Sequence, residues 1–232
     1  MKVVAHSVRI AAGDVMLDGD LTVPQPAGGV VAFAHGSGSS RHSPRNRYVA
    51  AELQTAGLAT LLADLLTPAE EQADARTARL RFDIGLLARR VSALTGWLAE
   101  HPATAGLPAG LFGASTGAAA ALVAAAGRPG PVAAVVSRGG RPDLAGAYLR
   151  SVRQPTLLIV GALDTVVIGL NRTAIREIGG EARLEIVPGA SHLFEEPGTL
   201  ERVAHLARSW FTRHLTPEPR QDRCSGGTTP NS

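Results

Sequence analysis

Residues 111–121 read LFGASTGAAAA, and this stretch decides how the rest of the chain is interpreted. Two large apolar residues precede a Gly-Ala-Ser-Thr-Gly pentapeptide, and a run of alanines follows it. The first part is typical of a buried strand and the last part of a helix, so Ser115 is expected at a tight strand-to-helix turn. The pattern matches G-x-S-x-G, which in this context predicts a nucleophilic serine under backbone strain. In isolation, an ordinary glycine-containing turn would have the same sequence.

Working outward from this turn, apolar runs alternate with segments of helical spacing. An antiparallel hairpin is expected at 9–24, and buried strands are expected at 30–36, 59–66, 108–115, 131–137, 154–164 and 182–191. Helices are expected at 47–56, 77–100, 116–126, 171–178 and 199–215, with a short flap or helix within 139–153. This alternation predicts an α/β fold: a mostly parallel sheet with helices on both faces, preceded by an antiparallel hairpin. No segment between the strands is long enough for a large cap domain.

Length and composition favour one soluble domain. The chain has 232 residues, of which 45% are hydrophobic and 19% charged, enough to build a sizeable core. We expect the domain to span 1–215 and the segment 216–232, rich in Pro, Gly, Ser and Thr, to be disordered. No apolar run approaches the roughly 20 residues that span a bilayer, and no cleavable leader is evident, so a cytoplasmic location is expected. Cys224 is the single cysteine, and neither a metal nor a cofactor is expected.

The charge pattern argues against a nucleic-acid partner. The formal net charge is +3, but Lys2 is the one lysine among 23 basic residues, and the arginines are spread along the whole chain. Aromatic residues make up only 4%, so the combination of a basic stripe with stacking aromatics is missing. We therefore expect a monomer or homodimer that acts on a small molecule, without a nucleic-acid or membrane partner.

A serine nucleophile needs a base and a group that orients the base. Downstream of Ser115, Asp164 ends the strand-like run TLLIVGALD, and His192 follows the run RLEIVPGAS. Both are expected just beyond the carboxyl ends of parallel strands, where open α/β sheets bind their ligands. The order Ser, Asp, His and these positions together predict a catalytic triad. Asp143, in the connection after the preceding strand, is the alternative acid.

Acyl transfer also needs donors for the oxyanion of the tetrahedral intermediate. One is expected to be the backbone N–H of Thr116, directly after the nucleophile. The second is assigned to the N–H of Ser37 in the glycine-rich loop HGSGS, with Gly36 and Gly38 as neighbouring possibilities. His35 is expected to form hydrogen bonds within this loop rather than to transfer protons.

The chain resembles the α/β-hydrolase superfamily from about residue 8 to residue 215, through LDGDL, the HG loop, GASTG, GALD and GASH. Within the superfamily it is most similar to the lidless dienelactone-hydrolase-like group. The resemblance implies catalytic Ser115, Asp164 and His192, with oxyanion donors at Ser37 and Thr116. Two departures make dienelactone itself a poor substrate candidate. Dienelactone hydrolases use a cysteine where this chain has Ser115, and a glutamate where it has Gly36.

Two arginine-bearing loops are expected to border the mouth of the site. They could give the mouth a positive potential and favour substrates with a carboxylate or phosphate. Alternatively, their arginines pair with Asp64, Glu70, Glu71 or Asp143 and brace the loops. The candidate substrate-binding residues are Arg41, Arg138, Arg141, Leu163, Val166 and Leu193.

These observations predict a serine hydrolase that cleaves a small carboxylic ester, lactone or thioester through an acyl-enzyme, with an ester substrate that can carry an anionic group. An amidase or a perhydrolase on the same triad is the first alternative. A different class of protein, a non-catalytic interaction protein that keeps the hydrolase fold, is the second, because fold alone does not imply function.

Overall fold

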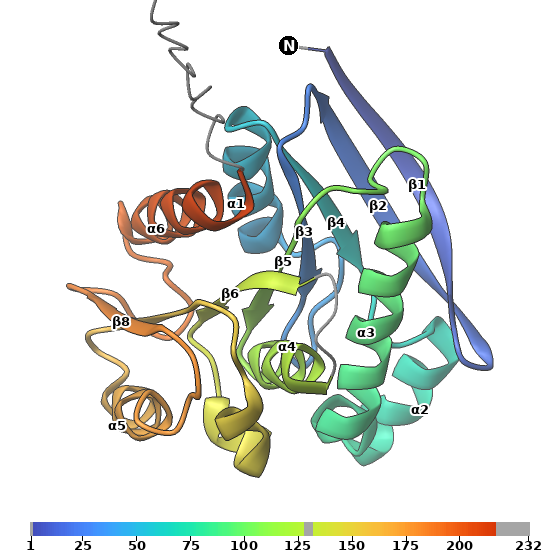
Figure 1. Cartoon of the computed structure of the whole chain (residues 1–232). Coiled ribbons are helices and arrows are strands. Elements are labelled where there is room, and N and C mark those ends of the chain that lie inside the picture. Colours follow the sequence, from blue (N-terminus) through green and yellow to red (C-terminus); the bar gives the residue numbers. More distant parts are fainter. Residues whose placement is uncertain (1, 128–131, 217–232) are drawn as a thin grey trace, which may run out of the picture.

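The computed structural model describes residues 2–127 and 132–216 (Figure 1). The predicted tail lies outside these residues except for Thr216, and so does Cys224. The strands are β1 Lys2–Ala12, β2 Val15–Gln25, β3 Gly29–Ala34, β4 Leu58–Ala63, β5 Ala109–Ala114, β6 Val132–Arg138, β7 Thr156–Gly161 and β8 Ala182–Val187. The α-helices are α1 Pro44–Thr55, α2 Pro68–Thr77, α3 Ile84–Glu100, α4 Thr116–Gly127, α5 Thr165–Ala174 and α6 Thr199–Leu215. Two 3₁₀ segments are η1 Leu80–Phe82 and η2 Pro142–Ser151.

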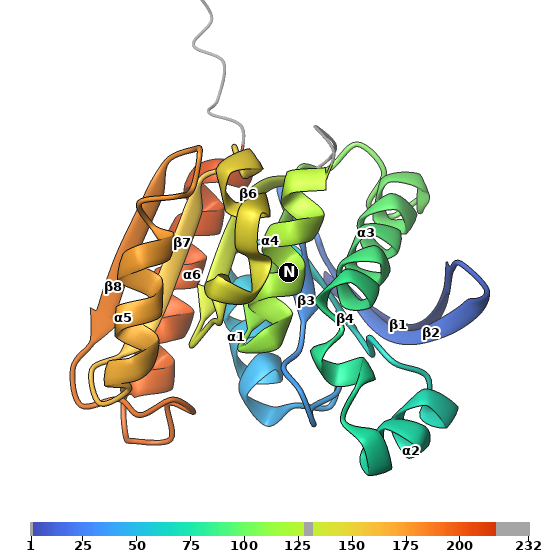
Figure 2. The ribbon, with the colours of Figure 1, turned by 90° about the horizontal axis from the view of Figure 1, so that it is seen from below.

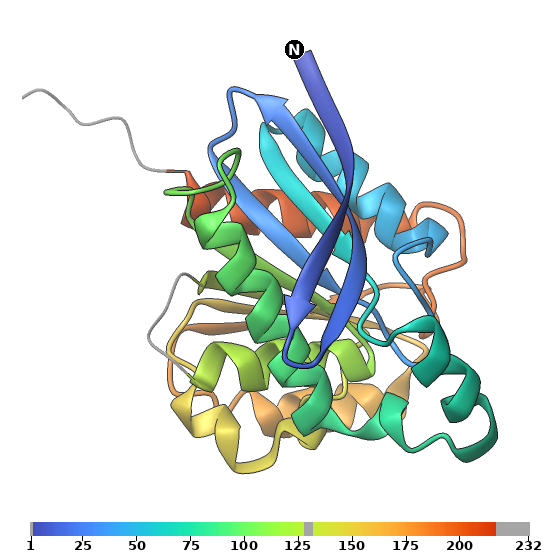
Figure 3. The same cartoon turned by 90° about the vertical axis from the view of Figure 1, so that its right-hand side faces the viewer.

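The strands form one eight-stranded sheet in the order β1-β2-β4-β3-β5-β6-β7-β8. The hairpin β1–β2 and the pair β2–β4 are antiparallel, and all other neighbours are parallel. The hairpin extends away from the rest of the sheet as a long twisted ribbon, seen in Figure 3. The predicted fold class and the N-terminal hairpin are therefore confirmed.

Helices cover both faces of the sheet (Figure 2). On one face, α1 and α6 pack against strand residues such as Phe33 and Phe112, whose rings lie 4.9 Å apart. On the other face, α3, α4, α5 and η2 contribute to a second core around Leu111 and Val135. Because every residue of β3, β4, β5 and β7 is buried, these strands read as continuous apolar runs rather than alternating ones.

Two helix predictions need correction. The helix predicted at 77–100 begins only at Ile84, after Asp83, whose carboxylate accepts the N–H of Leu86 at 2.8 Å. Helix α2, Pro68–Thr77, lies where no helix is predicted. The start of α2 carries a capping box, in which Thr67 accepts the N–H of Glu70 and the Glu70 carboxylate accepts the N–H of Thr67. The helix predicted at 171–178 begins earlier, at Thr165, directly after Asp164.

Candidate active site

The strand-to-helix turn is as tight as the sequence predicts. Ser115 is the single residue between β5 and α4, and its φ of +51° lies in the left-handed region, which non-glycine residues rarely adopt. Its N–H donates to the carbonyl of Arg138 at 3.2 Å, and its own carbonyl accepts the N–H of Arg141 at 3.2 Å. A Cβ at Gly113 would lie 2.8 Å from the backbone nitrogen of Ala118, so only glycine fits there. The strain at Ser115 is thus fixed by its surroundings.

His192 and Asp164 lie together at the same edge of the sheet. Nδ1 of His192 is 2.6 Å from Oδ2 of Asp164, with the aspartate side chain 15% exposed and the histidine side chain 40% exposed. The alternative acid, Asp143, instead accepts two hydrogen bonds from Arg141, at 2.9 and 2.7 Å. Of the two candidate carboxylates, Asp164 is therefore the one positioned to orient the imidazole.

The loop that carries His192 is closed by a hydrogen bond between two of its own residues and packs on Gly139. The carboxylate of Glu196 accepts the N–H of Ser191 at 3.0 Å, and the hydrogen bonds from Ser191 lower the pKa of Glu196 below its usual value. The ring of His192 packs on Gly139, where a Cβ would lie 3.5 Å from Nδ1. The segment that follows Arg138 thus touches both His192 and the backbone of Ser115. Among the described residues, however, no hydrogen bond joins Ser115 Oγ to His192, a contact that in many enzymes tightens only when substrate binds.

The loop after β3 lies directly against the turn. A Cβ at Gly36 would lie 3.1 Å from both the carbonyl oxygen of Ala114 and Cβ of Ser115, so the backbone here approaches the nucleophile closely. The N–H of Ser37 donates to Oγ1 of Thr116 at 2.9 Å. The structure thus brings together the two residues predicted as oxyanion donors. In this state one of their two N–H groups already has a side-chain acceptor.

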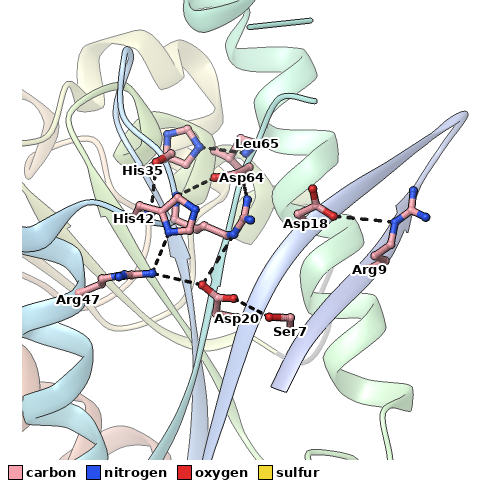
Figure 4. A network of polar contacts seen from close by, with 11 residues as sticks. Ser7, Arg9, Asp18, Asp20, His35, His42, Arg47, Asp64 and Leu65 are labelled. Atoms are coloured by element: carbon pink, nitrogen blue, oxygen red, sulfur yellow. Dashed lines mark hydrogen bonds and ion pairs between the residues drawn. The ribbon is translucent and has the colours of Figure 1, made fainter. Parts of the chain in front are cut away.

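His35 has both ring nitrogens in hydrogen bonds. Nδ1 lies 2.9 Å from the carbonyl oxygen of Gly36, and Nε2 accepts the N–H of Leu65 at 3.0 Å (Figure 4). An Nε2 that accepts must be unprotonated, which assigns the proton to Nδ1. Burial lowers the pKa of His35 below 6.5, against smaller opposing effects of Gly36, Asp64 and Glu71. The neutral ring therefore links the loop to the end of β4.

A cavity of about 570 Å³ opens beside this loop. It extends from Thr116 and the loop toward α1, α2 and α3. Its wall combines apolar Leu66 and Leu87 with the polar side chains of Asp74 and Arg81. The lining residues are His35, Gly36, Ser37, Gly38, Ser39, Ser40, His42, Ser43, Pro44, Arg45, Leu66, Glu71, Asp74, Arg81, Leu87 and Thr116.

None of the six predicted substrate-binding residues lines this cavity. Leu163, Val166 and Leu193 are exposed, by 65%, 74% and 39%. Arg141 pairs with Asp143. Arg138 is buried, and Arg41 pairs with Asp64 and Asp20.

Arg41 braces the loop against the hairpin through Asp64 and Asp20, two carboxylates that are labelled in Figure 4. Its guanidinium pairs with the carboxylate of Asp64 and lies 3.7 Å from that of Asp20 on β2. Arg47 joins the same network, 3.6 Å from Asp20 and 2.8 Å from Nδ1 of His42. For Arg41 and Arg141, pairing with acidic residues is what the structure shows, as the alternative interpretation of the arginines anticipated.

The cavity residues that the sequence analysis missed lie on α2 and the segment after it. Asp74 accepts the N–H of Leu80 at 2.7 Å and Nε of Arg81 at 2.5 Å. Burial alone would raise the pKa of Asp74, but the hydrogen bonds from Arg81 and Leu80 outweigh it and lower that pKa. Thr67-Pro68 followed by Glu70 is a helix start signal that would have placed α2 beside the site.

Two features were not found in the described part of the chain. Across residues 2–127 and 132–216, no three His, Cys, Asp or Glu side chains come together in a group that could hold a metal ion. In the same ranges no helix is both long and apolar enough to cross a membrane.

Comparison with known proteins agrees with this geometry. The profile described as "Dienelactone hydrolase family" matches residues 17–214. Two proteins from two strains of Mycobacterium tuberculosis, each named a putative phosphoribosyl transferase, are 62% identical over 210 residues. This alignment covers 90% of the chain but 46% of each relative, so the chain spans less than half the length of these proteins.

Solved structures extend the likeness. A dienelactone hydrolase from Anabaena variabilis is 58% identical, with a TM-score of 0.91 over 93% of this chain and 100% of its own. The esterase Est1E from Butyrivibrio proteoclasticus shares the fold, with a TM-score of 0.74 at 14% identity over 89% of this chain and 98% of its own. The fold, the strained serine turn and the family match together show that this α/β hydrolase belongs to the dienelactone hydrolase family.

Proposed function

We propose that the protein is a serine-dependent carboxylic ester hydrolase with Ser115 as nucleophile, His192 as general base and Asp164 as the orienting acid. The observation that carries this proposal is one arrangement at the edge of the sheet. A serine held at φ +51° and a histidine held 2.6 Å from a carboxylate both contact the segment that follows β6. Strained serine turns with this order of residues support nucleophilic acyl transfer.

The chemistry follows from these positions. His192 accepts the proton of Ser115 as Oγ attacks the ester carbonyl, and the protonated ring then returns it to the leaving alcohol. Asp164 holds Nδ1–H, which leaves Nε2 free to act and stabilises the charged ring. Water activated by the same histidine hydrolyses the acyl-enzyme and releases the acid.

The oxyanion donors we propose are the N–H groups of Ser37 and Thr116. Thr116 is the first residue of α4, so its N–H has no acceptor within the helix. The N–H of Ser37 donates to Oγ1 of Thr116 in this state. The substrate oxyanion would replace this hydroxyl as acceptor, at little cost because one hydrogen bond is exchanged for a stronger, charge-assisted one.

The substrate is expected to be compact. The adjoining cavity of about 570 Å³ falls within the range of small-molecule sites. We do not propose phosphoribosyl transfer, the activity in the names of the mycobacterial relatives, for this chain. This chain covers 46% of their length, and nearly all of it matches the hydrolase family.

A fluorophosphonate probe and a panel of p-nitrophenyl esters test the proposal. Wild type should be labelled at Ser115, and Ser115→Ala should lose labelling and at least on the order of a thousandfold in kcat. Ser92→Ala, the same change at an exposed serine on α3, should change neither. Retention of most activity in Ser115→Ala would refute the nucleophile.

The acid is tested by a matched pair of substitutions. Asp164→Asn should lower kcat by on the order of 10³ or more, because the histidine loses its orienting carboxylate. Asp143→Asn should leave kcat within a few fold. The reverse ranking would assign the acid to Asp143.

The same assays separate the alternatives. Turnover of p-nitroanilides or formation of peracid at rates that exceed ester hydrolysis would favour an amidase or a perhydrolase. A folded protein that neither hydrolyses any ester nor reacts with the probe would favour an interaction protein.

A further inference from the structure

One arginine beside Ser115 pairs with no acidic side chain among the described residues. Arg138 ends β6, and its carbonyl accepts the N–H of Ser115. The residue is 8% exposed, and both Nε and Nη1 are buried without any hydrogen-bond partner in the described part of the chain. Its guanidinium carbon lies 6.0 Å from the ring centroid of Phe194, two residues after His192. Buried polar groups are nearly always paired, so this pair of orphan donors requires an explanation.

The rest of the fold shows what a buried arginine normally receives here. Arg90 on α3 is 4% exposed and makes hydrogen bonds with both carboxylate oxygens of Glu70, at 2.7 and 3.3 Å. Arg81, which lines the cavity and is only partly buried, also has an acidic partner, because its Nε donates to Oδ2 of Asp74 at 2.5 Å. An uncompensated buried cation is costly, because desolvation is not offset by Coulomb attraction. Unlike Arg90 and Arg81, Arg138 has no acidic partner among the described residues.

A second arginine, at the cavity wall, acts on the charge of Arg138. Arg45, in the first turn of α1, lines the cavity, and its Nε is also buried without a partner in the described residues. Its Nη1 donates to Glu195 at 3.1 Å, but the side chain of that glutamate is 63% exposed. Burial, and next the charge of Arg45, lower the pKa of Arg138 to about 10. The charge of Arg45 thus acts on Arg138, and the one carboxylate that pairs with Arg45 among the described residues is largely solvated.

We propose that Arg138 and Arg45 form a subsite for a carboxylate or phosphate group carried by the ester substrate, beside Ser115. Three N–H-bearing nitrogens, two on Arg138 and one on Arg45, have no hydrogen-bond partner among the described residues, and such a group would supply the acceptors that they lack. Guanidinium groups match the planar geometry of carboxylate and the oxygens of phosphate, and their bonds to an anion are charge-assisted. The ring of Phe194 restricts where the Arg138 guanidinium lies. This inference rests on the proposed ester hydrolysis and specifies its substrate class.

The test compares anionic and neutral esters of matched size. One arm places the charge on the acyl side, with the p-nitrophenyl hemisuccinate and the p-nitrophenyl butyrate. The other places it on the alcohol side, with the acetate ester of glycerol 3-phosphate and glycerol monoacetate. In at least one arm the wild type should prefer the anionic ester in kcat/KM, and Arg138→Met should lower that anionic-to-neutral ratio at least tenfold.

Two further variants exclude simpler explanations. Arg138→Lys keeps the charge but not the planar fork, so it should retain part of the preference. Arg183→Gln removes one positive charge at an exposed position near the amino end of β8, whereas Arg138 lies at the carboxyl end of β6, and it should leave the ratio unchanged. Equal ratios for wild type and Arg138→Met in both arms would overturn the subsite. A similar fall of the ratio in Arg183→Gln would assign the preference to overall charge and overturn it too.

Failure of the proposed function is distinguishable from failure of the subsite. If wild type hydrolyses no ester and is not labelled at Ser115, ester hydrolysis is refuted, and the subsite is then tested by calorimetric titration with succinate and with inorganic phosphate. Binding that weakens at least tenfold in Arg138→Met supports the subsite. Absence of binding to the wild type, or equal binding to both proteins, refutes it.

Discussion

Replacing Arg138 by methionine should make the folded protein more stable. Most substitutions of buried residues destabilise a protein, so the expected sign is unusual. Methionine keeps an unbranched side chain that can pack against Phe194, and it removes a buried charge that has no acidic partner among the described residues. The difference in unfolding free energy between the two proteins thus measures how much Arg138 destabilises the fold.

The magnitude follows from the lowered pKa of Arg138. Desolvation, followed by the charge of Arg45, lowers that pKa from its usual value to about 10. At about 1.4 kcal/mol for each pH unit, the folded state opposes the charged side chain by about 3 kcal/mol. Packing differences for methionine offset part of this gain. We therefore expect the free energy of unfolding to rise by about 1–3 kcal/mol, or the Tm by about 3–10 °C.

The pH dependence has a definite sign. Below pH 10 the arginine is charged in both the folded and the unfolded chain, so the full cost is present at neutral pH and does not change with pH. In the wild type, this cost is relieved only as the pH rises above about 10. The difference in unfolding free energy between wild type and Arg138→Met should consequently be equal at pH 6 and pH 8.

Urea unfolding followed by circular dichroism at these two pH values is the assay, with Arg183→Gln as the charge control. Saturating succinate or phosphate should then reduce the difference, because ligand that binds the folded wild type stabilises it by mass action. A decrease of more than about 1 kcal/mol in the unfolding free energy of Arg138→Met would refute the reasoning, since Arg138 would then make stabilising interactions within the fold.

Three further predictions concern the loop after β3 and the turn. Gly36→Ala should lower kcat on the order of 10-fold to 100-fold with little loss of stability, because its Cβ, 3.1 Å from that of Ser115, pushes the oxyanion loop away. Steady-state kinetics that match wild type would contradict this. Gly117→Ala should lower the free energy of unfolding by about 3 kcal/mol or more, because its Cβ would overlap the carbonyl oxygens of Ala34 and His35 at the end of β3. A thermal melt unchanged from wild type would show that the turn can relax. His35 stays neutral in the fold, with its pKa lowered below 6.5 by burial, so stability should fall as the pH decreases below 6.5, where only the unfolded chain gains the proton. Urea unfolding at pH 7.5 and 5.5 should show a smaller pH effect in His35→Gln, and an equal effect would exclude His35 as its source.

The elements that the sequence predicts well are those whose signals are local. A buried strand, two glycines around Ser115 and a run of alanines specify the turn within about ten residues, because steric limits on the backbone decide it. Asp164 and His192 follow from position at strand ends, since parallel strands bring their carboxyl ends to one edge. Helix α2 and the late start of α3 were missed, although Thr67 and Asp83 are local cap residues that mark the two helix starts.

The location of the cavity depends on contacts between distant residues, and for that reason it could not be predicted. The loop after β3 is drawn toward β4 and the hairpin by the pairing of Arg41 with Asp64, 23 residues apart, and by Asp20. Arg81 folds back on Asp74 and places α2 over the loop. The cavity therefore opens toward α1, α2 and α3, and the exposed Leu163, Val166 and Leu193 do not line it.

The arginines show most clearly what tertiary structure adds. In the sequence Arg41, Arg138 and Arg141 are equivalent candidates for binding an anion, and each has acidic residues within reach in some fold. Only in three dimensions does pairing neutralise Arg41 and Arg141, while the end of β6 holds Arg138 where none of the described acids contacts it. An arginine that a carboxylate already occupies has its strongest donors engaged, whereas an unpaired one beside a nucleophile keeps them for a ligand. The residue that the fold leaves uncompensated is thus the one to substitute first.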